Sequence, residues 1–161
     1  MIRHTVVLTV PNATAKQFYD FMINPCDRRY RAWWPGAHLQ FHIVRRGEKN
    51  HIGDLVFADE YLGIDRRLTF FAVVIDAERP NKIKWQMMKA KLRIPAVLEL
   101  TLRDTDGGVR VKHALRIGCP GIGKLLDPLI ALYFNKPFQR ALEAHCKAEW
   151  FKRAEHLSVM G

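Results

Sequence analysis

The sequence predicts an α+β fold in which a long C-terminal helix lies across a curved antiparallel sheet and closes a cavity. Three observations carry this prediction. The stretch from Leu125 to Leu157 is the longest region with helical character, and its apolar residues recur at three- and four-residue steps. Nearly everything from His38 to Ile117 has strand character. The cleanest alternation, Val109 to Ile117, has one apolar and one polar face, as in an antiparallel sheet with one wet side.

The N-terminal segment predicts a strand followed by a short helix. Ile2 to Val10 alternates, and Pro11 ends the strand. Thr14 and Gln17 have the spacing of a capping box, which predicts a helix over 15–23.

A second short helix or irregular turn is expected from Cys26 to Pro35. It is very basic and ends in two adjacent tryptophans, Trp33 and Trp34. Adjacent residues cannot share one face of a regular element. We therefore expect one indole to pack inward and the other to lie at a rim.

Six further strands are predicted. If the first hairpin turns near Lys49, residues whose numbers sum to about 98 face each other, which places His38 near Glu60 and Phe41 near Phe57. The predicted strands run from His38 to Arg46, Gly53 to Tyr61, Arg67 to Ala77, Lys82 to Met88, Ile94 to Arg103 and Val109 to Ile117.

The link into the last helix, Gly118 to Gly123, is rich in glycine and is interpreted as a hinge. Asp127-Pro128 fits an N-cap with a first-turn proline. Pro137 must either kink the helix or mark a second start, with Asn135 as the cap.

The totals favour one ordinary globular domain over residues 1–161. No apolar run approaches the roughly 20 residues that span a bilayer, and the N-terminus lacks a signal-peptide layout, so a cytoplasmic location is expected. Cys26, Cys119 and Cys146 lack metal-site spacing and are interpreted as free thiols, with Cys146 as a packing residue.

The order of elements resembles the helix-grip fold of the START and pollen-allergen-like superfamily, also called SRPBCC. The resemblance covers essentially the whole chain and includes the Asp106-Gly107-Gly108 hairpin before the last strand. Within the superfamily the chain looks like the bacterial polyketide-cyclase/dehydrase-like group, to which Trp34-Pro35-Gly36-Ala37-His38, Asp59-Glu60-Tyr61 and His145-Cys146-Lys147-Ala148-Glu149 are similar. It has no Rieske or hydroxylase motif.

The resemblance implies a seven-stranded antiparallel sheet curved around the last helix, with an apolar cavity for lipids, polyketides or similar molecules between them. Members include binding proteins, cyclases and co-chaperones, so the fold alone leaves the function open. We expect a cavity for a hydrophobic small molecule and predict no cofactor.

His113 is the first candidate for chemistry, because it shares a strand face with apolar residues. It is a candidate acid or base, or a hydrogen-bond anchor, and the alternative is a core histidine bonded to a neighbour.

Two pairs supply further candidates. His145 and Glu149 share a helix face, and His38 and Glu60 are expected cross-strand neighbours. Converging under the helix, they would form an acid–base cluster for cyclisation or dehydration. Such a set also suits zinc or iron, although we predict no metal, and His145 with Glu149 could instead be a surface pair.

Aromatic and long apolar side chains are expected to line the cavity, although a filled core is the alternative for each. The predicted ligand-binding residues are Trp33, Trp34, Phe41, Phe57, Tyr61, Trp85, Met87, Phe138 and Leu142.

The net charge of +10 suits an anionic partner or serves solubility. Basic residues of the later strands are expected on the outer face of the sheet, where an adaptor for anionic membrane or RNA is a second alternative function. Nucleic acid is the less favoured partner, because no recognition motif accompanies the charge. Transient contact with an anionic membrane stays open, as does the oligomeric state.

Overall fold

The computed structural model describes residues 2–62, 66–89, 92–118, 128 and 135–159, and its centre is one seven-stranded antiparallel sheet. The strand order is β1-β7-β6-β5-β4-β3-β2, so β2 to β7 form a meander and β1 pairs with β7. The predicted fold class is confirmed. The strands are β1 (Ile2–Val10), β2 (His38–Arg45), β3 (Leu55–Leu62), β4 (Arg66–Glu78), β5 (Lys82–Lys89), β6 (Leu92–Thr105) and β7 (Gly108–Ile117).

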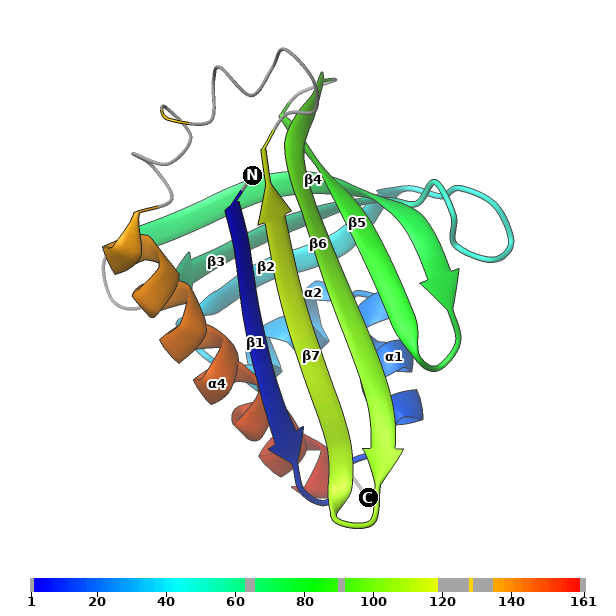
Figure 1. Ribbon diagram of the computed structural model, residues 1–161. Helices are drawn as coiled ribbons and strands as arrows, with labels where there is room; N and C mark the ends of the chain where they lie inside the picture. Colours follow the sequence, from blue (N-terminus) through cyan, green and yellow to red (C-terminus); the bar gives the residue numbers. More distant parts are fainter. Residues whose placement is uncertain (1, 63–65, 90–91, 119–127, 129–134, 160–161) are drawn as a thin grey trace.

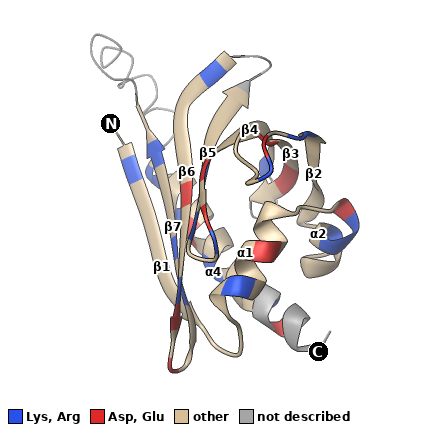
Figure 2. Ribbon diagram, turned by 90° about the vertical axis from the view of Figure 1, so that its right-hand side faces the viewer, with Lys and Arg blue, Asp and Glu red and all other residues tan. Residues whose placement is uncertain are grey.

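The sheet curves, and the helices occupy its concave side (Figure 1). Helix α4 (Lys136–Val159) crosses the sheet and contacts β1 and β3, while α1 (Ala15–Ile23) packs against β5 and β6, and α2 (Asp27–Trp33) packs against β2. Figure 2, turned by a quarter, shows α1, α2 and α4 on one side of the curved sheet. This layering leaves one face of each strand toward the helices and the other toward solvent.

Helix α1 (Ala15–Ile23) begins where the sequence predicts. The Thr14 side chain accepts a hydrogen bond from the Gln17 amide, and Gln17 accepts one in return from the Thr14 amide, which completes the capping box. Phe18 and Phe21 project from its apolar face into the core. Phe18 packs against Trp150 of α4, with ring centroids 5.2 Å apart.

Of the two alternatives expected between Cys26 and Pro35, the structure shows the helix, α2 (Asp27–Trp33). Asp27 in its first turn accepts a hydrogen bond from the Phe41 amide and contacts His42 Nδ1, so the helix is tied to β2. One turn later, Tyr30 and Trp33 share the buried face.

Helix α4 starts at a cap rather than at a kink. The Asn135 side chain accepts a hydrogen bond from the Phe138 amide, and Pro137 occupies the first turn, where its missing N–H is not needed. Of the two alternatives for Pro137, a kink or a helix start capped by Asn135, the structure shows the helix start. The predicted hinge after Gly118 and the Asp127-Pro128 start fall almost entirely outside the described residues.

A bulge in β2 corrects the predicted pairing. His38 pairs with Glu60, as expected, but Phe41 pairs with Ala58 and Phe57 with His42, because Leu39 is an extra residue in the strand. The bulge also explains how His38 and Phe41, which a regular strand would place on opposite faces, are both buried.

The outer face of β4 is less covered than its apolar sequence suggests. Phe71 and Val73 are half-buried and Ile75 is exposed, so only the inward face is fully in the core. Within the described part of the chain, no helix is both long enough and apolar enough to cross a membrane.

Candidate functional site

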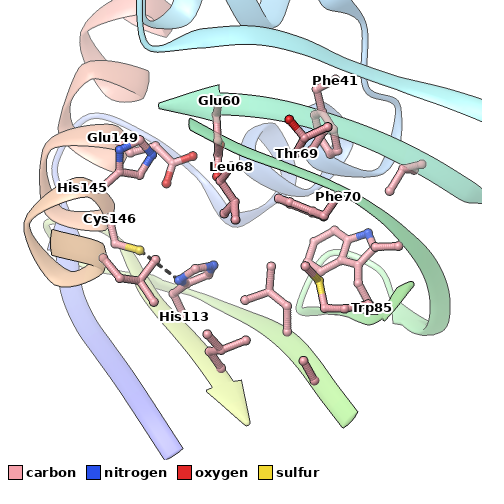
Figure 3. A pocket seen from close by; sticks show the side chains of 18 of the residues that line it. Phe41, Glu60, Leu68, Thr69, Phe70, Trp85, His113, His145, Cys146 and Glu149 are labelled. Atoms are coloured by element: carbon pink, nitrogen blue, oxygen red, sulfur yellow. Dashed lines mark hydrogen bonds between the residues drawn. The ribbon is translucent and has the colours of Figure 1, made fainter. Parts of the chain in front are cut away.

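A cavity of about 450 Å³ lies between the concave face of the sheet and α4. A volume of this size suits a small organic molecule. Most of its lining is apolar, and four histidine and glutamate side chains interrupt it, namely Glu60, His113, His145 and Glu149. Figure 3 shows His145 and Glu149 reaching in from α4, Glu60 from β3 and His113 from β7, with Trp85 set apart from them.

Five of the nine residues predicted to bind ligand line this cavity: Phe41, Trp85, Met87, Phe138 and Leu142. Small residues on the inward faces of the strands, including Ala58, Ala72 and Ala96, leave the space open between them.

Phe57 and Tyr61 require a correction. Val56, Ala58 and Glu60 of β3 face the cavity, so strand alternation turns Phe57 and Tyr61 to the outer face. There the Phe57 ring packs against Phe71, with centroids 5.0 Å apart.

The two adjacent tryptophans also lie outside the cavity lining. Trp33 is buried in the core, and its indole N–H donates to the Glu149 carbonyl at 2.8 Å. Trp34 is partly exposed and stacks on the His145 ring, with centroids 4.9 Å apart. One ring is thus inside and one at a rim, as the sequence predicts, and both support α4 rather than the cavity wall.

The two predicted His/carboxylate pairs converge. His38, Glu60, His145 and Glu149, which we call the polar cluster, each bring one nitrogen or oxygen ligand atom to within 4.8 Å of the others. His38 Nε2 lies 3.7 Å from Glu149 Oε1, which is longer than a hydrogen bond. The polar cluster is therefore a group of close but mostly unconnected side chains at one end of the cavity.

Local backbone structure explains how β2 and β3 place His38 and Glu60 in the polar cluster. Gly36 has φ of +83°, a conformation that favours glycine, and the turn around it lets the amide of His38 bond to the Trp34 carbonyl at 3.0 Å. His38 then opens β2 directly opposite Glu60. On α4, the four-residue spacing places His145 and Glu149 on one face.

Tyr30 completes the site and was not among the predicted residues. Its hydroxyl donates a hydrogen bond to Glu60 Oε2, and its ring stacks on His38 with centroids 3.9 Å apart and planes within 1°. The only available signal was the three-residue spacing of Tyr30 and Trp33 on a short helix, which indicates a buried face and says nothing of its partners.

Burial determines the protonation of the polar cluster. Loss of water raises the pKa of Glu60 to about 7, with a smaller opposing effect of the Tyr30 hydrogen bond, and raises the pKa of Glu149 well above its usual range. Burial also lowers the pKa of His38 to about 3 and of His145 to about 4. Both imidazoles are consequently neutral at pH 7.

His113 has a partner that sets it apart from the polar cluster. Its Nδ1 lies 3.0 Å from the sulfur of Cys146, and Figure 3 marks this contact. Burial raises the pKa of the Cys146 thiol and lowers that of His113 to about 4, so at neutral pH the pair is an uncharged thiol in contact with a neutral imidazole. This arrangement does not supply the thiolate that a cysteine nucleophile needs.

The outer face of the sheet neutralises part of its positive charge. Lys82 and Lys84 contact Asp76 at 3.0 and 3.5 Å, and Glu99 lies 3.3 Å from Lys84 and 3.5 Å from Arg116. Figure 2 shows acidic positions interspersed with basic ones along the chain. The later strands therefore do not form an uninterrupted basic stripe.

Comparisons with known proteins identify the fold. No protein-family model matches the chain, and no curated protein matches it. Among solved structures, the chain is similar to Ara h 8.0201, with a TM-score of 0.64 and 14% identity over 98% of each chain.

Two further structures agree. The chain matches the di-domain ARO/CYC BexL from the BE-7585A biosynthetic pathway at a TM-score of 0.63 and 14% identity, over 96% of this chain and 49% of BexL. It also matches protein MLL2253 from Mesorhizobium loti at 0.61 and 11% identity, over 99% of each chain. The chain has the helix-grip fold that the sequence predicts.

Proposed function

We propose that this helix-grip protein binds a hydrophobic small molecule with one polar end, in the cavity between the sheet and α4. The observation that carries the proposal is the asymmetry of the cavity, whose walls are mostly apolar and carry a few polar groups, among them Glu60, His113, His145 and Glu149. A pocket with apolar walls and a few placed polar groups is the usual form of a small-molecule site. The ARO/CYC designation of BexL supports a polyketide-like molecule as the ligand class.

The geometry suggests how such a molecule would lie. Its apolar body would contact Phe70, Trp85 and Leu98, and its polar end would approach Glu60 and His145. Burial of apolar surface supplies about 25 cal/mol per Å², so the body provides affinity while the polar end fixes direction.

The first test is mass spectrometry of small molecules that co-purify with the full chain prepared without detergent. A defined lipid or polyketide in stoichiometric amount would support the proposal. The second test titrates the stripped protein with the apolar fluorescent probe 8-anilinonaphthalene-1-sulfonate.

Two substitutions of cavity alanines make the second test specific. Ala72→Phe places a ring inside the cavity, and Ala96→Leu fills a smaller part of the same space from β6. We expect Ala72→Phe to weaken probe binding by at least about 30-fold, because the probe and the ring compete for one volume. Val44→Phe, at a half-exposed outer position, is the matched control and should bind as the wild type does. Equal binding by all four proteins would contradict the proposal.

A cyclase- or dehydratase-type enzyme is the second candidate. One observation favours it: imidazole and carboxyl groups from three elements face a single apolar cavity. Placement of an acid and a base around one substrate is the geometric requirement for such catalysis. Incubation with a linear poly-β-ketone analogue, followed by mass spectrometry for loss of water, tests it. No conversion over the reaction in buffer would leave the binding function alone.

A further inference from the structure

We propose that the polar cluster binds one divalent transition-metal ion, with zinc or ferrous iron as the best-suited ions. The four side chains come from β2, β3 and α4, and their ligand atoms all lie within 4.8 Å of one another. Glu60, His145 and Glu149 also line the cavity, but the metal proposal does not rest on the binding of a hydrophobic molecule, because a metal titration needs no such molecule.

The first argument is the state of the two imidazoles. His38 is 0% exposed and His145 is 5% exposed, and none of their four ring nitrogens has a hydrogen-bond partner within the described residues. A buried polar atom without a partner costs about 1–3 kcal/mol, so such atoms are rare. A metal ion would use one lone pair on each ring.

The second argument is charge. Glu149 is buried and Glu60 is partly buried in the cavity wall, and no Lys or Arg of the described ranges forms an ion pair with either. Two carboxylates in a dry site repel each other and lack the compensation that a buried charge requires. A divalent cation would match the charge of both groups in their deprotonated form, which the two imidazoles, neutral at pH 7, do not balance.

The third argument is the donor set and its dimensions. Two imidazole nitrogens and two carboxylate oxygens suit zinc or ferrous iron, whereas calcium and magnesium prefer oxygen alone. In a tetrahedral site with bonds of about 2.0–2.2 Å, the ligand atoms lie about 3.3–3.6 Å from one another. Since the ligand atoms of the polar cluster lie within 4.8 Å of one another, the side chains would have to close by up to roughly 1.5 Å around an ion.

The fourth argument is the surrounding support. The Tyr30 hydroxyl donates a hydrogen bond to Glu60 Oε2, and carboxylate ligands in metal sites are commonly held by such hydrogen bonds. Tyr30 also stacks on His38, and Trp34 stacks on His145, so both rings are held at a fixed angle. The cluster is therefore oriented before any ion arrives.

A bound ion would also change the roles within the cavity. While the ion is bound, the ligand atoms of the polar cluster hold it and cannot act as proton acceptors. His113 would then be the acid or base of the cavity wall. Because Glu60, His145 and Glu149 line the cavity, an open position on the ion would face it. The ion would supply a Lewis acid for an oxygen atom of a cavity ligand.

The test begins with the full chain stripped by a strong chelator and titrated with Zn²⁺ in competition with a chromophoric chelator. We expect one equivalent to bind, and Co²⁺ to give visible absorption bands at the same stoichiometry. Glu149→Gln keeps the shape of the side chain and should weaken Zn²⁺ binding by at least about 100-fold. Glu60→Gln and His145→Ala should act in the same direction.

Surface histidines provide the matched controls. His42 lies 2.9 Å from Asp27 and His51 lies 3.0 Å from Asp54, so each resembles an adventitious site. His42→Ala and His51→Ala should bind Zn²⁺ as the wild type does. Circular dichroism of the metal-free variants checks the fold, and the isosteric glutamine variants keep the test decisive should His145→Ala unfold.

A second measurement is thermal. One equivalent of Zn²⁺ should raise the melting temperature of the wild type and of both surface variants, and should leave Glu149→Gln unchanged, because an ion stabilises only the form that binds it. The proposal is overturned if neither Zn²⁺, Co²⁺, Fe²⁺ nor Mn²⁺ binds at one equivalent. It is equally overturned if Glu149→Gln binds like the wild type or if a surface variant abolishes the site.

Discussion

Acidic residues on the outer face of the sheet form ion pairs with basic side chains, whereas those at the polar end of the cavity form none with a Lys or Arg of the described residues. Outside, Asp59, Asp76 and Glu99 each contact a Lys or Arg within 3.5 Å. Inside, Glu60 and Glu149 face two neutral imidazoles and no basic side chain of the described residues. The polar cluster is therefore not an ordinary buried ion pair, because within the described residues it contains no cationic side chain.

Asp59 and Glu60 show the contrast within one dipeptide. They are neighbours on β3 and so point to opposite faces. The Arg67 guanidinium holds the pKa of Asp59 below its usual range, whereas burial raises that of Glu60 to about 7. Asp59 is paired with a basic side chain, whereas Glu60 accepts a hydrogen bond from Tyr30 and forms no ion pair with a Lys or Arg of the described residues.

The largest predicted effect concerns His113, whose partner is a thiol rather than an acid. Its pKa in the folded protein is about 4, against an ordinary 6.5, because burial and the nearby His145 and His4 disfavour its charged form. Between pH 6.5 and 4, His113 binds a proton in the unfolded chain but stays neutral in the folded protein. The stability contributed by neutral His113 is thus complete above pH 6.5 and is lost as the pH falls, by up to about 3 kcal/mol.

His113→Leu isolates this contribution. Glu60 and Glu149 titrate with the opposite sign, since their raised pKa values favour proton uptake by the folded state. The informative quantity is therefore the difference in unfolding free energy between wild type and His113→Leu, measured by urea titration from pH 4 to 8. We expect the wild type to lose stability relative to His113→Leu as the pH falls. Parallel curves of unfolding free energy against pH would show that His113 titrates normally.

The second prediction tests whether a metal ion in the polar cluster reaches the cavity. Two aryl probes of equal size are compared, one ending in a hydroxamate and the other in a methyl ester. One equivalent of Zn²⁺ should tighten the hydroxamate probe by at least about tenfold, because it offers oxygen ligands to the ion. The ester should gain little. Fluorescence titration with wild type and Glu149→Gln checks this, and equal gains for both probes would place the ion elsewhere.

The sequence predicts the fold around the cavity better than the residues that line it. Strand alternation, the Thr14/Gln17 capping box and the inward face of His113 all depend on local periodicity, and the structure has each of them. The pairing of His38 with Glu60 also followed from counting across one hairpin. Only the sheet curvature and the path of α4, which no local pattern encodes, bring that pair to His145 and Glu149.

The errors have physical causes. Leu39 is an extra residue in β2, and nothing in its apolar character marks a bulge. Phe57 and Tyr61 were expected to line the cavity because they are aromatic, but an open space requires small inward residues such as Ala58. On β3 the large rings therefore cover the outer face, and alternation with Glu60 already implied this.

The third prediction compares the outer face directly. Asp59→Asn removes the charge that Arg67 contacts through two hydrogen bonds of 2.8 and 2.6 Å. Because the Arg67 side chain is 56% exposed, solvent screens the pair, and we expect the melting temperature to fall by only a few degrees at pH 8. The loss should diminish in high salt. A drop that is independent of salt would mean that the carboxylate acts through packing instead.

The fourth prediction applies the same change one residue later and has the opposite sign. Glu60→Gln keeps an oxygen that accepts from Tyr30 but removes a buried charge that no Lys or Arg of the described residues balances. In metal-free protein at pH 8 we expect a slightly higher melting temperature, because an uncompensated buried charge is costly. With one equivalent of Zn²⁺ the order should reverse, since only the wild type gains the ion. Differential scanning calorimetry of Asp59→Asn and Glu60→Gln, each with and without Zn²⁺, distinguishes a residue paired by the protein from one paired by a metal.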